Sequence, residues 1–326
     1  MFGLFRLLLA VMVMVMVGHL FWISDFGRYA VFGFFILSGY LMTFLMHESY
    51  SYQLDGLKKF VANRVLRLYP AYWVACVFSI FLILCLGEVN TRVVSRSLSL
   101  PQTLDIIVVN LTMVSFSLFP HEVGPRLSPA TWALTVELFY YCLIGLGVSK
   151  TKTRTAVWLC LSLTYVLLTY ALGLFWHSRY FALPAGSLPF SIGALLYFLH
   201  KENWEPNWIK RPILSSKYLM LALIVNAGIG SKIQLDDSML DIVELFFYAN
   251  LLICSLLIYS IIRGDSLVNI SKKLDKTLGD YSYPIYLIHW QIGTLASFIV
   301  YGNVVSLKYQ IAPMAWLVSG ILVMFS

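Results

Sequence analysis

Runs of about 18–20 apolar residues recur along the chain, and they limit the folds open to it more than any other feature. As a helix, each run is long enough to cross a hydrocarbon core of about 30 Å. Inside such a core only helices and closed barrels satisfy the backbone hydrogen bonds. Of the 326 residues 60% are hydrophobic and only 12% are charged, which is too little charge for the surface of a soluble protein of this length. We therefore predict an all-α fold, a polytopic transmembrane helical bundle.

The candidate spans number about ten. They cover roughly residues 4–22, 29–47, 70–87, 131–148, 156–175, 180–199, 214–231, 243–262, 281–301 and 309–325. One further apolar stretch, Ile106–Phe119, has only 14 residues, which at about 1.5 Å each reach only about 21 Å. This stretch also contains one asparagine, one threonine and two serines. It is therefore short and polar for a simple span.

The distribution of lysine and arginine indicates whether Ile106–Phe119 crosses the membrane. If the stretch dips in and returns, with the N-terminus cytoplasmic, 16 of the 23 basic residues lie on the cytoplasmic side. If it crosses, only 9 of them do. Because the positive-inside rule favours the first arrangement, we predict about ten spans, one re-entrant or interfacial segment and two cytoplasmic termini. The expected location is the cell inner (plasma) membrane, and the partner of these charges is the lipid bilayer rather than nucleic acid.

The chain is predicted to form one domain, residues 1–326. No internal repeat or low-complexity tract occurs, and the hydrophilic stretches are under about 20 residues. The first apolar run lacks a small-residue cleavage pattern, so we interpret it as a retained helix rather than a signal peptide. All five cysteines lie in apolar runs without a CxxC pair, which predicts neither a disulfide framework nor a metal site.

One acidic residue, Glu137, lies inside the apolar run TWALTVELFYY. A charged acidic group at the centre of a membrane costs about 2.5–3.5 kcal/mol, so an ionisable residue there indicates a functional site. In the predicted topology His19 lies at a similar depth, near the outer end of the first helix. A histidine and a carboxylate together could transfer a proton, because the acid fixes the imidazole tautomer. The alternative is a structural hydrogen bond between helices.

Two further constellations are candidates for binding. Arg64 and Arg67 are three residues apart and share one helix face at the cytoplasmic surface, where two guanidinium groups could bind phosphates or simply provide the inside charge of a loop. Ser38 in FFILSGYLM permits a close helix approach. His289 in YSYPIYLIHW falls near the middle of a predicted span, where it could be functional or hydrogen-bonded to a neighbouring helix.

Taken in order, these motifs resemble the acyltransferase 3 family of integral-membrane O-acyltransferases. The resemblance runs over nearly the whole chain, through FRLLLA and a histidine after it, FFILSGYLM, RVLRLYPAYW, WALTVELFYY and YSYPIYLIHW. It implies transfer of an acyl group, usually acetyl from cytoplasmic acetyl-CoA, to a hydroxyl of a cell-envelope carbohydrate such as O-antigen, capsule or exopolysaccharide, or of a lipid-linked glycan. It resembles the stand-alone type, without a fused hydrolase-like domain.

The resemblance also implies roles for residues. His19 would be the base toward the acceptor hydroxyl or the transient acyl carrier, and Glu137 would orient it. Arg64, Arg67 and Arg6 would bind the phosphates of the donor, and no metal would be needed. The polar lining of the site would include His289, Ser38, Tyr72 and Trp132.

The position of Arg6 departs from the family pattern. Family members have ten residues between the arginine and the histidine of the first helix, whereas twelve separate Arg6 from His19 here. A step of eleven rotates about 20° net around an ideal helix, but a step of thirteen rotates about 220°. Either the helix contains a bulge, or Arg6 does not share the site with His19.

Two other functions remain open from the sequence. A proton-coupled transporter or flippase of a lipid-linked or small polar substrate could use Glu137 and His19 as a relay, although the inverted repeat typical of many transporters is absent. A non-catalytic membrane subunit would tolerate alanine at His19. The acceptor sugar, the acyl chain length and the oligomeric state are not encoded in a recognisable motif.

Overall fold

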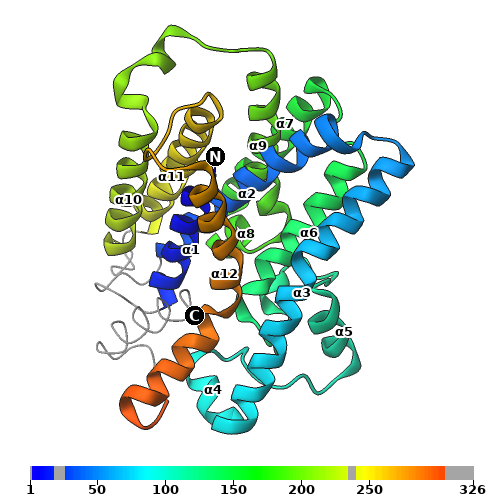
Figure 1. Cartoon of the computed structure of the whole chain (residues 1–326), viewed down its shortest axis with the longest axis vertical. Helices are drawn as coiled ribbons and strands as arrows, with labels where there is room; N and C mark the ends of the chain where they lie inside the picture. Colours follow the sequence, from blue (N-terminus) through cyan, green and yellow to red (C-terminus); the bar gives the residue numbers. More distant parts are fainter. Residues whose placement is uncertain (1, 18–25, 234–239, 305–326) are drawn as a thin grey trace.

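The computed structural model describes residues 2–17, 26–233 and 240–304, and every regular element within these ranges is helical. The long helices are α1 (Gly3–Val17), α2 (Phe26–Leu45), α3 (Leu54–Leu86), α6 (Trp132–Gly145), α7 (Lys152–Ala171), α9 (Ser187–Lys201), α10 (Ser216–Ile233), α11 (Leu240–Ile262) and α12 (Lys272–Tyr301). The short ones are α4 (Glu88–Val94), α5 (Leu104–Thr112) and α8 (Trp176–Tyr180). The predicted all-α class is confirmed. Figure 1 shows α3 running diagonally along one side of the bundle and α10 on the opposite side.

Five helical segments among the described residues are long and apolar enough to cross a membrane. They are Phe26–Tyr50, Leu54–Leu86, Lys152–Ala171, Leu183–Lys201 and Ile242–Ile262. A shorter apolar helix covers Gly3–Met14. The last candidate span, 309–325, lies outside the described residues. Helices that are long and apolar enough to span a membrane are thus present, while the number of about ten spans stays a prediction.

Helix α3 presents one buried stripe to the bundle. Its buried residues recur every three or four positions, the spacing of one face of an α-helix. They are Gly56, Phe60, Arg64, Leu68, Tyr72, Ala75, Cys76, Ser79, Leu82 and Ile83. The sequence indicates a span that begins at Pro70, but the helix begins at Leu54 and continues through Pro70. The reason is that its first turns are amphipathic and already pack against the bundle.

Helix α2 lies at the centre and crosses α9 at very short range. A Cβ atom at Gly39 would lie 2.2 Å from the carbonyl oxygen of Phe190. A Cβ atom at Gly193 would lie 2.0 Å from the carbonyl oxygen of Ile36. Because both close contacts are to backbone carbonyls inside a helix and not to flexible side chains, the two glycines set both the separation and the rotation of α2 against α9.

The start of α1 is attached to α12 by a carboxylate. The Asp275 oxygens Oδ2 and Oδ1 accept hydrogen bonds from the backbone N–H groups of Gly3 and Leu4, each at 3.0 Å. The first N–H groups of a helix lack partners within it, so Asp275 satisfies two of them and opposes the positive end of the helix dipole. This contact fixes where α1 enters the bundle, and with it the position of Arg6.

The stretch Ile106–Phe119 is not one helix. Helix α5 ends at Thr112, and Met113 adopts a left-handed conformation with φ 58°. Its nine residues reach about 14 Å, well short of a hydrocarbon core. Asn110 is 5% exposed and bonds the backbone of the loop that leads to α6, donating to Pro125 O at 2.9 Å and accepting from Leu127 N at 2.8 Å. Whether this segment is re-entrant or interfacial stays a prediction.

Candidate active site

A cavity of about 310 Å³ lies between five helices. Its lining residues come from α1, α2, α3, α6 and α12. They are Arg6, Val31, Phe34, Phe35, Leu37, Ser38, Leu41, Met42, Phe44, Leu45, Arg64, Arg67, Leu68, Ala133, Leu134, Glu137, Tyr141, Ser282, Tyr283 and Tyr286. The wall is mostly apolar, with a few charged groups and hydroxyls gathered in it. This composition is typical of small-molecule sites.

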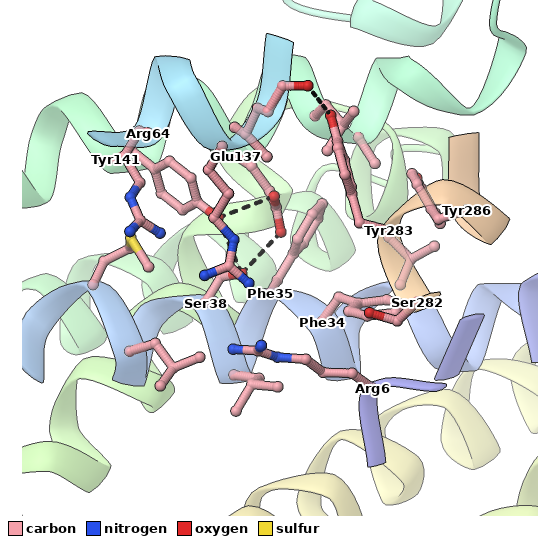
Figure 2. A pocket seen from close by; sticks show the side chains of 18 of the residues that line it. Arg6, Phe34, Phe35, Ser38, Arg64, Glu137, Tyr141, Ser282, Tyr283 and Tyr286 are labelled. Atoms are coloured by element: carbon pink, nitrogen blue, oxygen red, sulfur yellow. Dashed lines mark hydrogen bonds between the residues drawn. The ribbon is translucent and has the colours of Figure 1, made fainter. Parts of the chain in front are cut away.

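Glu137 is the only acid among the described lining residues, and two hydroxyls hold its carboxylate. Ser38 Oγ of α2 donates to Glu137 Oε1 at 2.9 Å, and Tyr141 Oη donates to Oε2 at 3.1 Å. The Glu137 residue is 8% exposed. Figure 2 shows both bonds, with Arg6 on the α1 side of the cavity and Arg64 beside Tyr141. Together the two hydrogen bonds fix the orientation of the carboxyl group.

Arg64 and Arg67 differ in exposure although they are one turn apart on α3. Arg64 falls in the buried stripe and is 8% exposed. Its Nε has no hydrogen-bond partner among the described residues, and its guanidinium carbon lies 5.9 Å from the ring centre of Phe60. Arg67 is exposed and lines the same cavity. One cation therefore lies deep in the cavity wall and one remains accessible to solvent.

The structure places Arg6 in the cavity lining with Glu137, Arg64 and Arg67. The twelve residues between Arg6 and His19 had not decided whether Arg6 belongs to the site. Helix α1 is a continuous α-helix from Gly3 to Val17, and His19 lies outside the described residues. The relation between Arg6 and His19 therefore stays a prediction.

The three guanidinium groups of the cavity form no ion pair in the described parts of the chain. None of Arg6, Arg64 and Arg67 is within ion-pair distance of an aspartate or glutamate there. The lining as a whole contains three arginines and one glutamate, so it carries an excess of positive charge. A buried cation without a partner is costly, which makes this cavity suited to an anionic ligand that would supply the missing charge.

The remaining predicted site residues are dispersed. Ser38 lines the cavity. His289 is 3% exposed and lies outside the lining, with Nδ1 2.8 Å from Tyr286 O and Nε2 without a partner among the described residues. Tyr72 donates to Asn110 O at 2.5 Å, and Trp132 packs its ring 5.0 Å from that of Phe181. Neither Tyr72 nor Trp132 lines the cavity.

Four polar lining residues were not identified from the sequence: Tyr141, Ser282, Tyr283 and Tyr286. Tyr141 could have been found, because it follows Glu137 by four positions and must share its helix face. Tyr283 and Tyr286 belong to the same motif as His289, and they donate to the backbone carbonyls of Leu68 and Ala130, each at 2.9 Å. No local signal distinguishes these tyrosines from ordinary packing residues.

A comparison with families of known proteins identifies one match. Residues 4–326 match the acyltransferase 3 family, described as an acyltransferase domain. No curated protein and no solved structure matches the chain. The match covers all five helices that line the cavity except the first residue of α1.

Proposed function

Because the chain belongs to the acyltransferase 3 family, we propose that it is a membrane-embedded O-acyltransferase. In this proposal it moves an acyl group, acetyl by expectation, from cytoplasmic acyl-CoA to a hydroxyl of a cell-envelope carbohydrate. The family supports acyl transfer. The nature of the donor and of the acceptor is the proposed part.

The observation that carries the proposal is the set of three arginines that line one cavity with Glu137 and form no ion pair with an acidic side chain of the described residues. Coenzyme A is a multiply phosphorylated nucleotide with a long neutral arm that ends in the thioester. Arginine is suited to phosphate because its planar group donates two parallel hydrogen bonds. We assign Arg67, which is exposed, to the outer phosphates and Arg64 and Arg6 to negative charge that enters further. The apolar wall formed by α2 would then accommodate the neutral arm.

Glu137 is proposed to provide the base chemistry of the cavity together with His19. A carboxyl group held by two hydroxyls keeps one orientation, which is the requirement for a group that positions an imidazole or accepts a proton. His19 is proposed as the base toward the acceptor hydroxyl or as a transient acyl carrier. The charge distribution supports a donor that enters from the cytoplasm, since the positive-inside arrangement places the loop before α3 on that side.

The test is mass spectrometry of surface glycans from matched cells with and without the protein. We expect the mass increment of an acetyl group only where the protein is present and catalytically intact, and a Glu137→Gln variant at equal membrane abundance should lack it. In parallel, the purified protein in detergent should release free CoA from acetyl-CoA. The proposal would be contradicted if the intact protein neither acetylated surface glycans nor released CoA.

A further inference from the structure

Ser38 combines three features that its place in an apolar helix does not require. It lines the cavity, its hydroxyl donates to Glu137 Oε1 at 2.9 Å, and Tyr141 Oη lies 3.4 Å from Ser38 Oγ. A hydroxyl whose proton points at a buried carboxylate is the arrangement of a nucleophile and its base. The carboxylate is in turn fixed by a third group, Tyr141, at 3.1 Å.

The backbone around Ser38 fixes the direction of this hydroxyl. The next residue, Gly39, faces the Phe190 carbonyl so closely that a Cβ atom there would lie 2.2 Å from its oxygen. Helix α2 therefore cannot rotate about its axis without a collision on the α9 side. Ser38 is held toward Glu137 rather than reaching it by a free side-chain rotation, which is the pre-organisation that a reacting group needs.

The charge around Ser38 suits the intermediate of an acyl transfer. Attack of a hydroxyl on a thioester carbonyl develops negative charge on the carbonyl oxygen. Arg6, Arg64 and Arg67 line the same cavity and form no ion pair with an acid among the described residues, and Figure 2 shows Arg6 on the α1 side and Arg64 beside Tyr141. Fixed positive groups in a water-poor site are the most effective means to stabilise such an oxyanion.

The cavity has the size of a site for one small ligand. Its volume of about 310 Å³ lies within the range of about 300–1,000 Å³ that is typical of such sites. With a covalent intermediate the donor can leave before the acceptor enters.

We propose that Ser38 is the nucleophile that carries the acyl group between donor and acceptor. This inference rests on the proposed function. In the first half, Ser38 Oγ bonds to the acyl carbonyl carbon and its proton passes to Glu137. The C–S bond then breaks, and the sulfur leaves as the CoA thiol with that proton.

In the second half, the acceptor hydroxyl bonds to the same carbonyl carbon and its proton passes to Glu137, which the departing thiol has left ionised. The bond from that carbon to Ser38 Oγ breaks, and Ser38 regains the proton from Glu137. One ester is exchanged for another, and no oxidant or further reactant is required.

Ser38 is a better candidate than the other hydroxyls of the cavity. Ser282 also lines it, but its Oγ donates to Gly279 O of its own helix at 2.6 Å and has no carboxylate partner. Tyr141 does contact Glu137, but it is only 7% exposed and its hydroxyl is divided between Glu137 and Ser38. These two residues therefore serve as internal comparisons in the test.

The test uses the full-length protein in detergent, incubated with radiolabelled acetyl-CoA and no acceptor, then quenched in acid and digested. We expect a burst of free CoA stoichiometric with protein and label on the peptide that contains Ser38, with none on the Ser282 or Tyr141 peptides. Ser38→Ala should lose both the burst and the label. Ser38→Cys should carry the label as a thioester, which neutral hydroxylamine cleaves while an oxygen ester survives. Label on any other residue would overturn the inference.

The outcomes separate this inference from the proposed function. If cells with the intact protein acetylate their glycans but no acyl-enzyme forms, transfer is direct and Ser38 is not the carrier. If Ser38→Ala cells retain full glycan acetylation at matched abundance, the inference is equally excluded. If the intact protein neither releases CoA nor acetylates glycans, the proposed function fails as well.

Discussion

Glu137 and Tyr141 lie on successive turns of α6, and the tyrosine hydroxyl donates to Glu137 Oε2 at 3.1 Å. Removing this hydroxyl by Tyr141→Phe leaves the bond from Ser38 intact. We expect a loss of acyl-transfer rate of about tenfold, because one hydrogen bond to a charged group contributes about 1.5 kcal/mol or more. Glu137→Gln removes the charge itself and should reduce the rate by about 10²–10⁴-fold. Single-turnover release of CoA measures both.

The two arginines of α3 are expected to act on donor affinity in different ways. Arg64→Ala removes a buried cation and should strongly raise the KM for acetyl-CoA. Arg64→Lys should retain only part of the affinity for acetyl-CoA, because lysine lacks the planar guanidinium group that donates two parallel hydrogen bonds. Arg67 is exposed, so its contribution should weaken as salt is raised. Arg92→Ala is the control, since Arg92 does not line the cavity and pairs with Glu88, with 3.5 Å between Arg92 Nη2 and Glu88 Oε2. An unchanged KM in the Arg64/Arg67 double alanine variant would reject the assignment.

The two predicted histidines should separate by substitution. His19→Ala and His19→Gln should nearly abolish glycan acetylation, because neither alanine nor an amide accepts a proton at neutral pH. His289→Ala should retain most activity, since His289 lies outside the cavity lining. Protein abundance in the membrane must be equal in all variants. Near-normal acetylation in the His19 variants, with loss in His289→Ala, would show that the reactive histidine has been misassigned.

Cysteine labelling can test the predicted topology. Cysteines introduced at Lys152 and Lys273 should react only from the cytoplasmic side, and one at Arg92 only from outside. Three native cysteines are exposed in the described structure, namely Cys85, Cys142 and Cys160, so they must be replaced first. Labelling of position 152 from outside would mean that Ile106–Phe119 crosses the membrane.

A buried ion pair on another side of the bundle predicts stability rather than activity. Arg179 Nε and a second guanidinium nitrogen donate to both oxygens of Glu244 at 2.8 and 2.6 Å, and the two side chains are only 7% and 11% exposed. Glu244→Gln should lower the free energy of unfolding by on the order of 3 kcal/mol, because it leaves a buried cation without its counter-charge. The exposed pair of Lys152 and Glu202 is the control. Glu202→Gln should change the free energy of unfolding by only about 0–1 kcal/mol. Thermal unfolding in detergent distinguishes the two.

The sequence predicted those features that depend on one helix at a time. Apolar length predicts helices, and a lone charge in an apolar run, as at Glu137, marks a residue that needs a polar surrounding. The spacing of Arg64 and Arg67 correctly predicts that they share a helix, but it does not reveal that Arg64 alone falls in the buried stripe. That difference depends on which face of α3 the bundle covers.

Relations between helices were not accessible in the same way. Arg6 could not be placed from its rotation relative to His19, because its position depends on the anchoring of α1 by Asp275. The apolar pattern from Pro70 onward predicts a span that begins there, whereas packing of the amphipathic turns before it extends the helix back to Leu54. Tyr283 and Tyr286 reach the cavity through the crossing of α12 with its neighbours, which no local pattern encodes.

The contact of α2 with α9 has a consequence for how this chain can change over time. Helix α9 contributes none of the described lining residues. Its Gly193, however, packs against the backbone carbonyl of Ile36, and Ile36 precedes Ser38 by about half a helical turn. A larger residue at 193 has to displace α2, and any displacement alters the alignment of Ser38 with Glu137. Mutations at the contact of α2 with α9, outside the described cavity lining, can therefore abolish the activity while the bundle still inserts and folds. Retention of the activity during evolution therefore depends on Gly39 and Gly193, two residues that have no reactive side chain.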